Sequence, residues 1–188
     1  MELHPPAVPV PDGLRTERVL LRPLRATDVE LDYDAVMSSA AMLRTWSQSD
    51  WPADDFTLAA NLADLERHER EHLARDAFTY TVLTPDAARC LGCVYLSPPW
   101  PEEVPLCAGA AYAAHVGFWV RASEIASDLD RHLLEHLRDW FQSEWAFERV
   151  VVSINPGDGR QARLLAESGL TRTAEFERAD GRRCVAYV

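Results

Sequence analysis

Apolar and polar residues recur along the chain with periods that predict seven strands and four helices. Residues 17–24 show the two-residue period typical of a strand, and six later segments are alternating or fully apolar. We expect these further strands at 77–84, 89–97, 111–121, 149–155, 171–178 and 182–188. Leucine and aromatic residues at helical spacing predict helices at 25–43, 56–76, 129–145 and 159–170. This order of elements indicates one α/β domain with a mixed sheet.

Local signals refine the limits of the predicted helices. Thr27 is a plausible N-cap for the first helix, and Gly169 fits the position just after the last one. Turn-forming residues predict loops at 47–55 and 98–106. The second helix carries one leucine stripe that we expect to face the core: Leu58, Leu62, Leu65 and Leu73.

The length and composition are those of a single globular domain. The chain has 188 residues, of which 47% are apolar and 26% charged, and no apolar run approaches the roughly 18–20 residues of a membrane span. Residues 1–13 form a Pro-rich lead-in without the basic and apolar regions of a secretory signal. We therefore expect a domain at 14–188 and a cytoplasmic protein.

The charge balance limits the classes of partner. The formal net charge is −11, and all 19 basic residues are arginines. An excess of acid disfavours nucleic acids and anionic membranes, whose binding needs clustered cations. It is compatible with a cationic substrate such as an amine, or simply with solubility. Any anion site must use guanidinium or backbone N–H groups.

The cysteines do not form a recognisable metal or redox motif. Cys90 and Cys93 are spaced C-x-x-C, but inside a predicted strand, where residues three apart point to opposite faces. Cys107 and Cys184 supply no second pair. We expect four buried free thiols in a reducing compartment.

Two helical segments contain histidines with the spacing of zinc peptidases. His68 to His72 reads H-E-x-x-H, and His132 to His136 reads the inverted H-x-x-E-H. Residues four apart share a helix face and can hold one ion, but neither segment is followed by a recognisable third ligand. We interpret both as histidines on solvated helix flanks and expect no metal.

Two longer segments carry a family resemblance. The segments LRTERVLLRPLRATD and HVGFWVRASEIASDLDRHLLEHLRDWF resemble the GNAT N-acetyltransferase superfamily, in particular the branch with ribosomal-protein alanine acetyltransferases. The resemblance covers residues 14–180. It implies a mixed, mostly antiparallel central sheet of about seven strands with helices on both faces. It also implies acetyl-CoA as co-substrate, an amine on a small molecule or peptide as acceptor, and a possible homodimer.

The resemblance also implies which residues meet the cofactor. Residues 117–121 match the strand whose end separates from its neighbour to admit the pantetheine arm, and the next helix would receive the pyrophosphate at its N-terminus. Residues 154–170 match the last cofactor segment, although Asp158 stands where asparagine is usual. The residues placed at the cofactor are Phe118, Trp119, Val120, Arg121, Ser127, Asp128, Leu129, Asp130, Arg131, Asn155, Asp158 and Arg160.

The phosphate loop departs from the family pattern. The usual Arg/Gln-x-x-Gly-x-Gly/Ala aligns with Ile125, Asp128 and Asp130. Two carboxylates there would repel a pyrophosphate, by about 1–4 kcal/mol for each unit-charge pair near 4 Å. Alternatively, Ser127 or Asp128 simply caps the helix that begins at Leu129, which then binds no phosphate. Arg121 or Arg131 could compensate the acidic charge if phosphate does bind. Two hypotheses therefore stand: an N-acyltransferase with an altered loop, and a GNAT-fold binding or regulatory module without canonical CoA binding.

Catalytic and acceptor residues are chosen by their place in this pattern. His115 is the first candidate for a general base because imidazoles exchange protons near neutral pH, with a core histidine as the alternative. Tyr112 is a candidate acid for the leaving thiolate, with packing as the alternative. Asp158 has an alternative role as a helix N-cap. Three tryptophans in predicted loops are candidates for the acceptor wall, or for ordinary packing: Trp46, Trp51 and Trp100.

Overall fold

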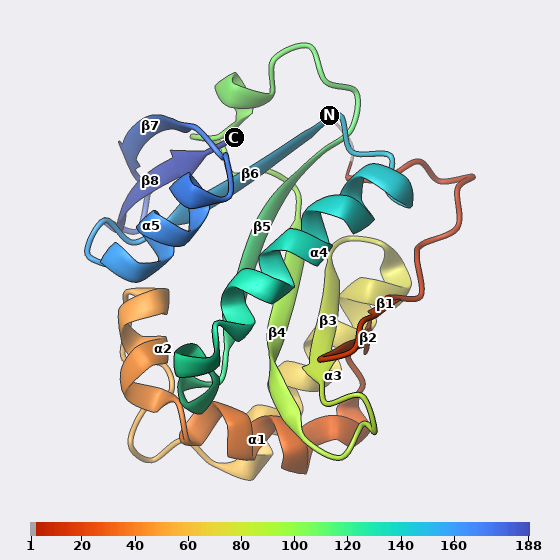
Figure 1. Ribbon diagram of the computed structural model, residues 1–188, viewed down its shortest axis with the longest axis vertical. Helices are drawn as coiled ribbons and strands as arrows, with labels where there is room; N and C mark the ends of the chain where they lie inside the picture. Colours follow the sequence, from red (N-terminus) through yellow and green to blue (C-terminus); the bar gives the residue numbers. More distant parts are fainter. Residues whose placement is uncertain (1–2) are drawn as a thin grey trace.

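The computed structural model describes residues 3–188 and shows one eight-stranded sheet (Figure 1). The strand order is β1-β2-β3-β4-β5-β6-β8-β7, and β5 and β6 form the one parallel pair. The bounds are β1 Leu14–Arg15, β2 Leu20–Pro23, β3 Phe78–Leu83, β4 Cys90–Ser97, β5 Ala113–Val120, β6 Arg149–Ile154, β7 Arg172–Glu177 and β8 Arg183–Tyr187. The mixed, mostly antiparallel sheet is confirmed, and the two-residue β1 adds an eighth strand at the edge.

Helices cover both faces of the sheet, as the sequence predicts (Figure 1). Their bounds are α1 Val29–Met37, α2 Ala40–Ser47, α3 Leu58–Ala74, α4 Leu129–Ser143 and α5 Gly159–Glu167. Leu133 of α4 and Phe118 of β5 belong to the core on one face. Leu43 of α2 and Leu65 of α3 pack with Trp119 on the other. Within residues 3–188, no helix is both long and apolar enough to cross a membrane.

The segment after β2 is divided, although the sequence predicts one helix there. A 3-10 turn at Ala26–Asp28 precedes α1, and Ser38 and Ser39 separate α1 from α2. The Ser39 hydroxyl accepts a hydrogen bond from the backbone N–H of Ala122 at 3.1 Å. Serine side chains that bond to backbone compete with helix continuation. Thr27 lies inside the 3-10 turn, so the prediction that it caps the helix was wrong.

The predicted leucine stripe of α3 was also wrong. Leu65 is buried, but three leucines lie on the exposed side: Leu58, Leu62 and Leu73. The side facing the sheet instead carries the half-buried His68 and His72. His68 Nδ1 lies 3.2 Å from the Thr79 hydroxyl, and the His72 ring packs edge-on against Phe78. The histidines of the H-E-x-x-H segment are therefore packing residues, not residues of a solvated flank.

The Pro-rich lead-in packs against the domain instead of standing apart. Leu3 and His4 are buried, and the His4 ring centroid lies 5.0 Å from that of Trp145. The buried Tyr80 hydroxyl donates a hydrogen bond to the carbonyl of Pro11 at 2.6 Å. Residues 3–13 thus complete one end of the core.

A β-bulge changes the expected placement of the C-x-x-C cysteines. The register of β3 and β4 shifts between Val82 and Leu83, which leaves Leu91 as the extra residue on β4. Cys90 and Cys93 consequently reach the same core cluster, whereas a regular strand would send them to opposite faces. All four cysteines are buried and free, as expected.

A buried carboxyl group on α1 makes stability depend on pH. Burial raises the pKa of Asp32 to about 6, and a hydrogen bond from Asn61 Nδ2 at 2.9 Å offsets only part of this effect. The unfolded chain releases this proton near pH 3.9. The folded state therefore binds more protons between these values, so the contribution of Asp32 to stability is fully present below about pH 4 and is lost as the pH rises through about 6. The difference corresponds to about 3 kcal/mol.

We expect Asp32→Asn to raise the free energy of unfolding by about 2 kcal/mol at pH 7 and to change it little at pH 4. Urea unfolding at both pH values measures this difference. Glu30→Gln, at an exposed position of the same helix, is the control and should change stability by less than about 0.5 kcal/mol. An equal stabilisation by Asp32→Asn at both pH values would contradict the assignment.

Candidate active site

β5 and β6 separate in the middle of the sheet and leave a groove. Their parallel pairing covers three residue pairs and ends at His115 and Val151, although β5 runs on to Val120 and β6 to Ile154. A cavity of about 280 Å³ lies along the unpaired part of β5, beside α2 and the start of α5. Figure 1 shows the two strands diverging with α2 and α5 beside the gap. The space beside this part of β5 is open apart from the Gln161 side chain, which reaches the strand.

Backbone groups of β5 point into this groove. Successive residues of a strand direct their N–H and C=O groups to opposite sides. The Trp119 carbonyl points to β4, since a Cβ added at Gly92 would lie 2.1 Å from its oxygen. The N–H and C=O groups of Phe118 and Val120 therefore face the groove. The Gln161 side chain crosses it and donates from Nε2 to the Phe118 carbonyl at 3.3 Å. The groove suits a slender chain that carries amide groups.

Acidic and arginine side chains pair where α4 and α5 begin, at the other end of the groove. The buried Asp130 accepts hydrogen bonds from Arg160, with Nε to Oδ2 at 2.8 Å and Nη2 to Oδ1 at 2.9 Å. Arg160 Nη2 also lies 3.2 Å from Asp128 Oδ1. These three residues line a small hollow, and Arg131 and Arg163 line it too. The two carboxylates are thus partly neutralised by a neighbouring guanidinium group.

Asp128 has the backbone conformation that favours glycine. Its φ of 54° and ψ of 36° lie in the left-handed region, directly before α4. Glycine is the residue that the GNAT pattern has at this position. The backbone therefore keeps the turn that glycine normally makes, although the side chain has changed. Asp128 makes no side-chain cap to α4, so the capping alternative is wrong for this residue.

Other residues expected at the phosphate have partners of their own or lie in the core. The buried Arg121 donates to Asp34 of α1 at 2.8 Å, so it does not compensate the acidic loop. Arg131 pairs with a glutamate of α5, and the Ser127 hydroxyl accepts from an arginine before β2. Leu129 is part of the core. Arg160 is the residue that compensates the acidic pair.

A second cavity of about 170 Å³ adjoins the groove, and Trp46 and Gln161 line both. Residues from α2, β4, β5, β6 and β8 surround it, together with the loop after β4. Two arginines, Arg178 and Arg182, lie in its wall, and both pair with Asp180. Further lining residues are Tyr95, Trp100, His115, Gly117, Ser153, Asn155 and Cys184. This cavity is the candidate acceptor site.

His115 is held at the floor of the second cavity by a buried carboxylate. Glu103 is fully buried, and its Oε1 lies 2.8 Å from His115 Nδ1. Ser153 donates to the same oxygen at 2.5 Å, and the backbone N–H of Trp100 donates to Oε2 at 2.9 Å. The Trp100 ring stacks on the imidazole with a centroid separation of 3.9 Å. A carboxylate accepts, so Nδ1 carries the hydrogen and Nε2 is left as a proton acceptor.

The other sequence candidates divide between these cavities and the rest of the fold. Trp46 and Trp100 line the second cavity, while Trp51 lines a neighbouring hollow beside α3. Trp46 belongs to α2 and not to a loop. Tyr112 precedes β5 and lines neither cavity, so the geometry gives it no access to a thioester.

The two candidates after β6 help to shape the groove. Asp158 lines the first cavity, and its Oδ1 accepts a hydrogen bond from Gln161 N at 2.9 Å, which is the alternative N-cap role. Asn155 lines the second cavity and donates from Nδ2 to the Thr45 carbonyl at 2.7 Å. Asn155 thereby ties the end of β6 to α2.

Several residues of the site escaped the sequence analysis. Glu103 lies in the Pro-rich loop, where its spacing from His115 carries no signal. Ser153 and Gln161 sit within ordinary strand and helix patterns, and Arg178 comes from the last hairpin. The one available hint is that Glu103 is an acidic residue between prolines beside Trp100.

The fold and this site define the class of protein. Residues 18–171 match the family described as Acetyltransferase (GNAT) domain, so the chain belongs to that family. The match supports the expected acetyl-CoA-dependent N-acetyltransferase and does not favour a binding module without CoA. It agrees with the separated strands and with the order of elements.

Solved structures of several acetyltransferases share the fold. RimL, a ribosomal L7/L12 α-N-protein acetyltransferase in complex with coenzyme A, is 15% identical with a TM-score of 0.73, covering 92% of this chain and 93% of that one. The ribosomal-protein-S5-alanine acetyltransferase from Vibrio fischeri is 17% identical with a TM-score of 0.72, covering 93% and 94%. The microcin C7 self-immunity acetyltransferase MccE, in complex with acetyl-CoA and AMP, is 13% identical with a TM-score of 0.74, covering 95% and 96%. No curated protein matches the chain by sequence.

Proposed function

We propose that this protein transfers the acetyl group of acetyl-CoA directly to a primary amine bound beside His115. The observation that carries the proposal is that the open groove adjoins the cavity lined by His115, with Trp46 and Gln161 common to both. Acetyl-CoA would supply the thioester, and the coenzyme A and acetyl-CoA in the solved RimL and MccE structures support its use. The Phe118 and Val120 backbone groups would hold the pantetheine amides. Gln161 would exchange its bond to Phe118 for one to the cofactor.

The phosphate end of the groove would use guanidinium groups where other family members use glycines. Arg160 is tied to Asp130 and Asp128 but is 43% exposed at its side chain, so it can turn towards a pyrophosphate. Arg131 and Arg163 lie beside it. A planar guanidinium group matches two phosphate oxygens at once. The acidic pair would then weaken binding without preventing it.

His115 would act as the general base. Its Nε2 would accept a proton from the amine nitrogen as that nitrogen bonds to the acetyl carbon, and the C–S bond breaks. The proton balances the thiolate that leaves. Glu103 keeps Nδ1 protonated, orients the ring and stabilises the imidazolium formed in this step. Ser153 and the Trp100 backbone N–H each donate a further hydrogen bond to the Glu103 carboxylate.

The acceptor cavity favours an amine whose molecule also carries an anionic group. Arg178 lies 3.9 Å above the Trp100 ring and lines the cavity with Arg182, whereas the acidic Glu103 beneath is covered. The whole protein has a negative net charge, but the charged side chains that line this cavity are arginines. Peptide N-termini are suitable acceptors, since RimL and the S5-alanine enzyme are described as acetyltransferases of ribosomal proteins.

Titration with acetyl-CoA tests the proposal, and Asp128→Gly sharpens the test. The substitution removes a negative charge beside the phosphate site and relieves a left-handed backbone. We expect saturable calorimetric binding that becomes about threefold to tenfold tighter in the variant, since about 1 kcal/mol of repulsion is removed. Asp55→Gly removes the same charge at an exposed loop position and should leave affinity unchanged. If neither the unchanged protein nor Asp128→Gly binds acetyl-CoA at millimolar concentration, the proposed function is contradicted.

A further inference from the structure

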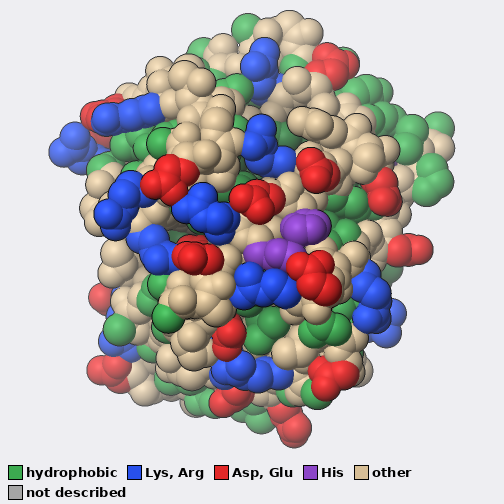
Figure 2. Space-filling view, viewed as in Figure 1, with side chains coloured by type: hydrophobic (Ala, Val, Ile, Leu, Met, Phe, Trp, Pro, Cys, Tyr) green, Lys and Arg blue, Asp and Glu red, His purple; other side chains and the backbone are tan. Residues whose placement is uncertain are grey.

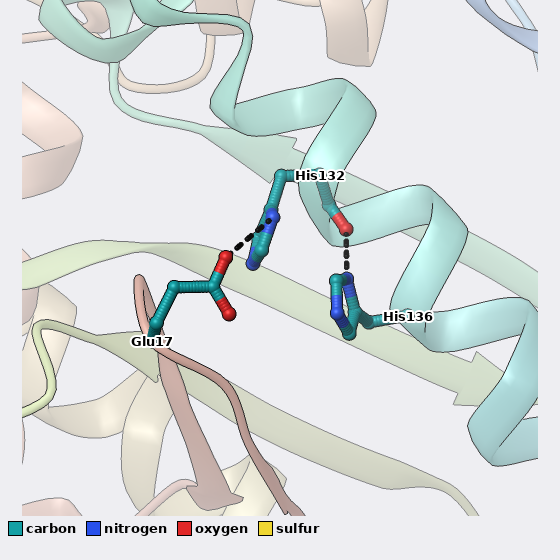
Figure 3. A group of neighbouring side chains, drawn as sticks. All are labelled: Glu17, His132 and His136. Carbon is teal, nitrogen blue, oxygen red and sulfur yellow. Dashed lines mark hydrogen bonds and ion pairs between the residues drawn. The ribbon is translucent and has the colours of Figure 1, made fainter.

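A histidine pair and a glutamate meet on the flank of α4 that faces the β1–β2 turn. Within residues 3–188, Glu17, His132 and His136 form the one group of three potential metal ligands, with ligand atoms within 4.8 Å of one another. Figure 3 shows both imidazoles on α4 with the Glu17 carboxylate opposite them. Figure 2 shows that histidine side chains reach the surface here, beside acidic and arginine side chains. The opposite flank of α4 contacts α5 through Arg131, so this cluster is separate from the groove.

Hydrogen bonds fix the His136 imidazole in an orientation suited to a ligand. His136 Nδ1 lies 2.8 Å from the backbone carbonyl of His132. A carbonyl only accepts, so Nδ1 carries the hydrogen and the Nε2 lone pair remains free. Metal-bound histidines generally donate their other ring N–H in this way, which fixes ring and tautomer.

The His132 imidazole is held through both ring nitrogens. Its Nε2 lies 2.8 Å from the Thr16 hydroxyl, and its Nδ1 lies 3.7 Å from Glu17 Oε1. Thr16 Oγ1 already accepts hydrogen bonds from the backbone N–H groups of Arg18 and Val19, so its hydroxyl donates to Nε2, and Nδ1 carries the hydrogen on the side of Glu17. A metal ion bound at Nδ1 would require this hydrogen to move to Nε2 and the Thr16 hydroxyl to turn.

We infer that Glu17, His132 and His136 bind one divalent transition-metal ion of the Zn²⁺ class. Two imidazoles and one carboxylate form the donor set of many three-ligand zinc sites, whose fourth position holds water. Ligand atoms around tetrahedral zinc lie about 3.3 Å apart, so the cluster must contract by about 1.5 Å. Glu17 is in a turn with 75% of its side chain exposed, so its carboxylate is free to move towards the two imidazoles. The inverted H-x-x-E-H segment thus gains the third ligand that the sequence alone does not reveal.

The bound ion would join two parts of the fold that are far apart in sequence. Glu17 belongs to the turn between β1 and β2, and the histidines belong to the first turns of α4. An ion bound only by the folded state stabilises that state according to its concentration and affinity. The bound ion would therefore link the edge of the sheet to the helix that follows the phosphate loop. It would take no part in acetyl transfer.

Zinc and cobalt titrations of protein prepared without a histidine tag test this inference. We expect one Zn²⁺ per chain by calorimetry, a rise of the thermal midpoint with Zn²⁺, and visible d–d bands of four- or five-coordinate Co²⁺. Loss of an outer hydrogen-bond partner alone weakens metal sites roughly 10–100-fold, so Glu17→Ala and His136→Gln should each weaken binding at least about tenfold. Glu17 is exposed, so its variant keeps the fold even if a histidine variant does not.

His68→Gln is the matched control, because it removes a histidine of similar helical spacing that the structure places against the sheet. It should leave the zinc affinity and the cobalt spectrum unchanged. Absence of saturable binding at millimolar zinc would overturn the inference. So would binding that Glu17→Ala and His136→Gln leave intact.

Discussion

Replacement of His115 by asparagine is expected to lower kcat for acetyl transfer by about 10²–10⁴-fold, the usual contribution of a positioned general base. The amide can still meet Glu103 and fill part of the space under Trp100, but it cannot accept the proton that the attacking amine nitrogen loses. Affinity for acetyl-CoA should stay within about twofold, because the cofactor groove is lined by other residues. Steady-state kinetics with a thiol-release assay, together with calorimetry, measures both quantities.

Tyr112→Phe is the matched control for this experiment. The sequence pattern makes Tyr112 a candidate acid, whereas the structure places it before β5 and outside both cavities. We expect its kinetics to match those of the unchanged protein. If His115→Asn leaves the rate within twofold, His115 is not the base. If Tyr112→Phe alone abolishes transfer, the reaction takes place outside the two cavities.

Glu103→Gln is expected to reduce kcat at least about tenfold without a change in KM for acetyl-CoA. The amide has nearly the same shape, but it removes the charge that holds the His115 tautomer and stabilises the imidazolium. Loss of a carboxylate in this role costs up to roughly 10⁴-fold in a serine protease triad. Glu103 touches the imidazole and not the substrate, so it is a positioning residue.

The separation of kcat from KM distinguishes positioning from a purely structural role. Glu103 is fully buried and also receives hydrogen bonds from Ser153 and Trp100, so unfolding of the variant should be measured alongside its kinetics. Glu102→Gln, one residue earlier and partly exposed, should change neither quantity. A folded Glu103→Gln protein with unchanged kcat would show that His115 does not depend on this carboxylate.

Periodicity predicted the fold well because the large elements of this chain bury one continuous face. In α4, Leu133, Leu137 and Trp140 are buried at the spacing that the sequence shows. Periodicity did not predict the orientation of α3, where Asn61 bonds to α1, the two histidines face the sheet, and three of the four leucines of the predicted stripe face outwards. Hydrogen bonds and ring contacts to β3 decide the orientation of that helix, and a hydrophobicity pattern contains no information about them.

The active site was predictable only in part, because its residues are joined by long-range contacts. The positions of His115 and of the β5 backbone in the site could be predicted because both belong to one clearly recognisable strand. Glu103 reaches His115 from an irregular loop, and Arg160 reaches Asp130 from a helix that begins 30 residues later. The family pattern identified the acidic phosphate loop, but only coordinates show that a guanidinium group already lies against it.

The cations that surround the groove are all guanidinium groups, and this choice protects the protein from its own chemistry. Arg131, Arg160 and Arg163 line the hollow beside Asp128 and Asp130, and Arg178 and Arg182 line the second cavity, which we propose to be the acceptor site. A lysine in any of these places would present a nucleophilic amine close to an activated thioester. Guanidinium groups keep their proton at every physiological pH and attack poorly. The chain contains no lysine, so no side-chain amine of its own can compete with the acceptor or become acetylated.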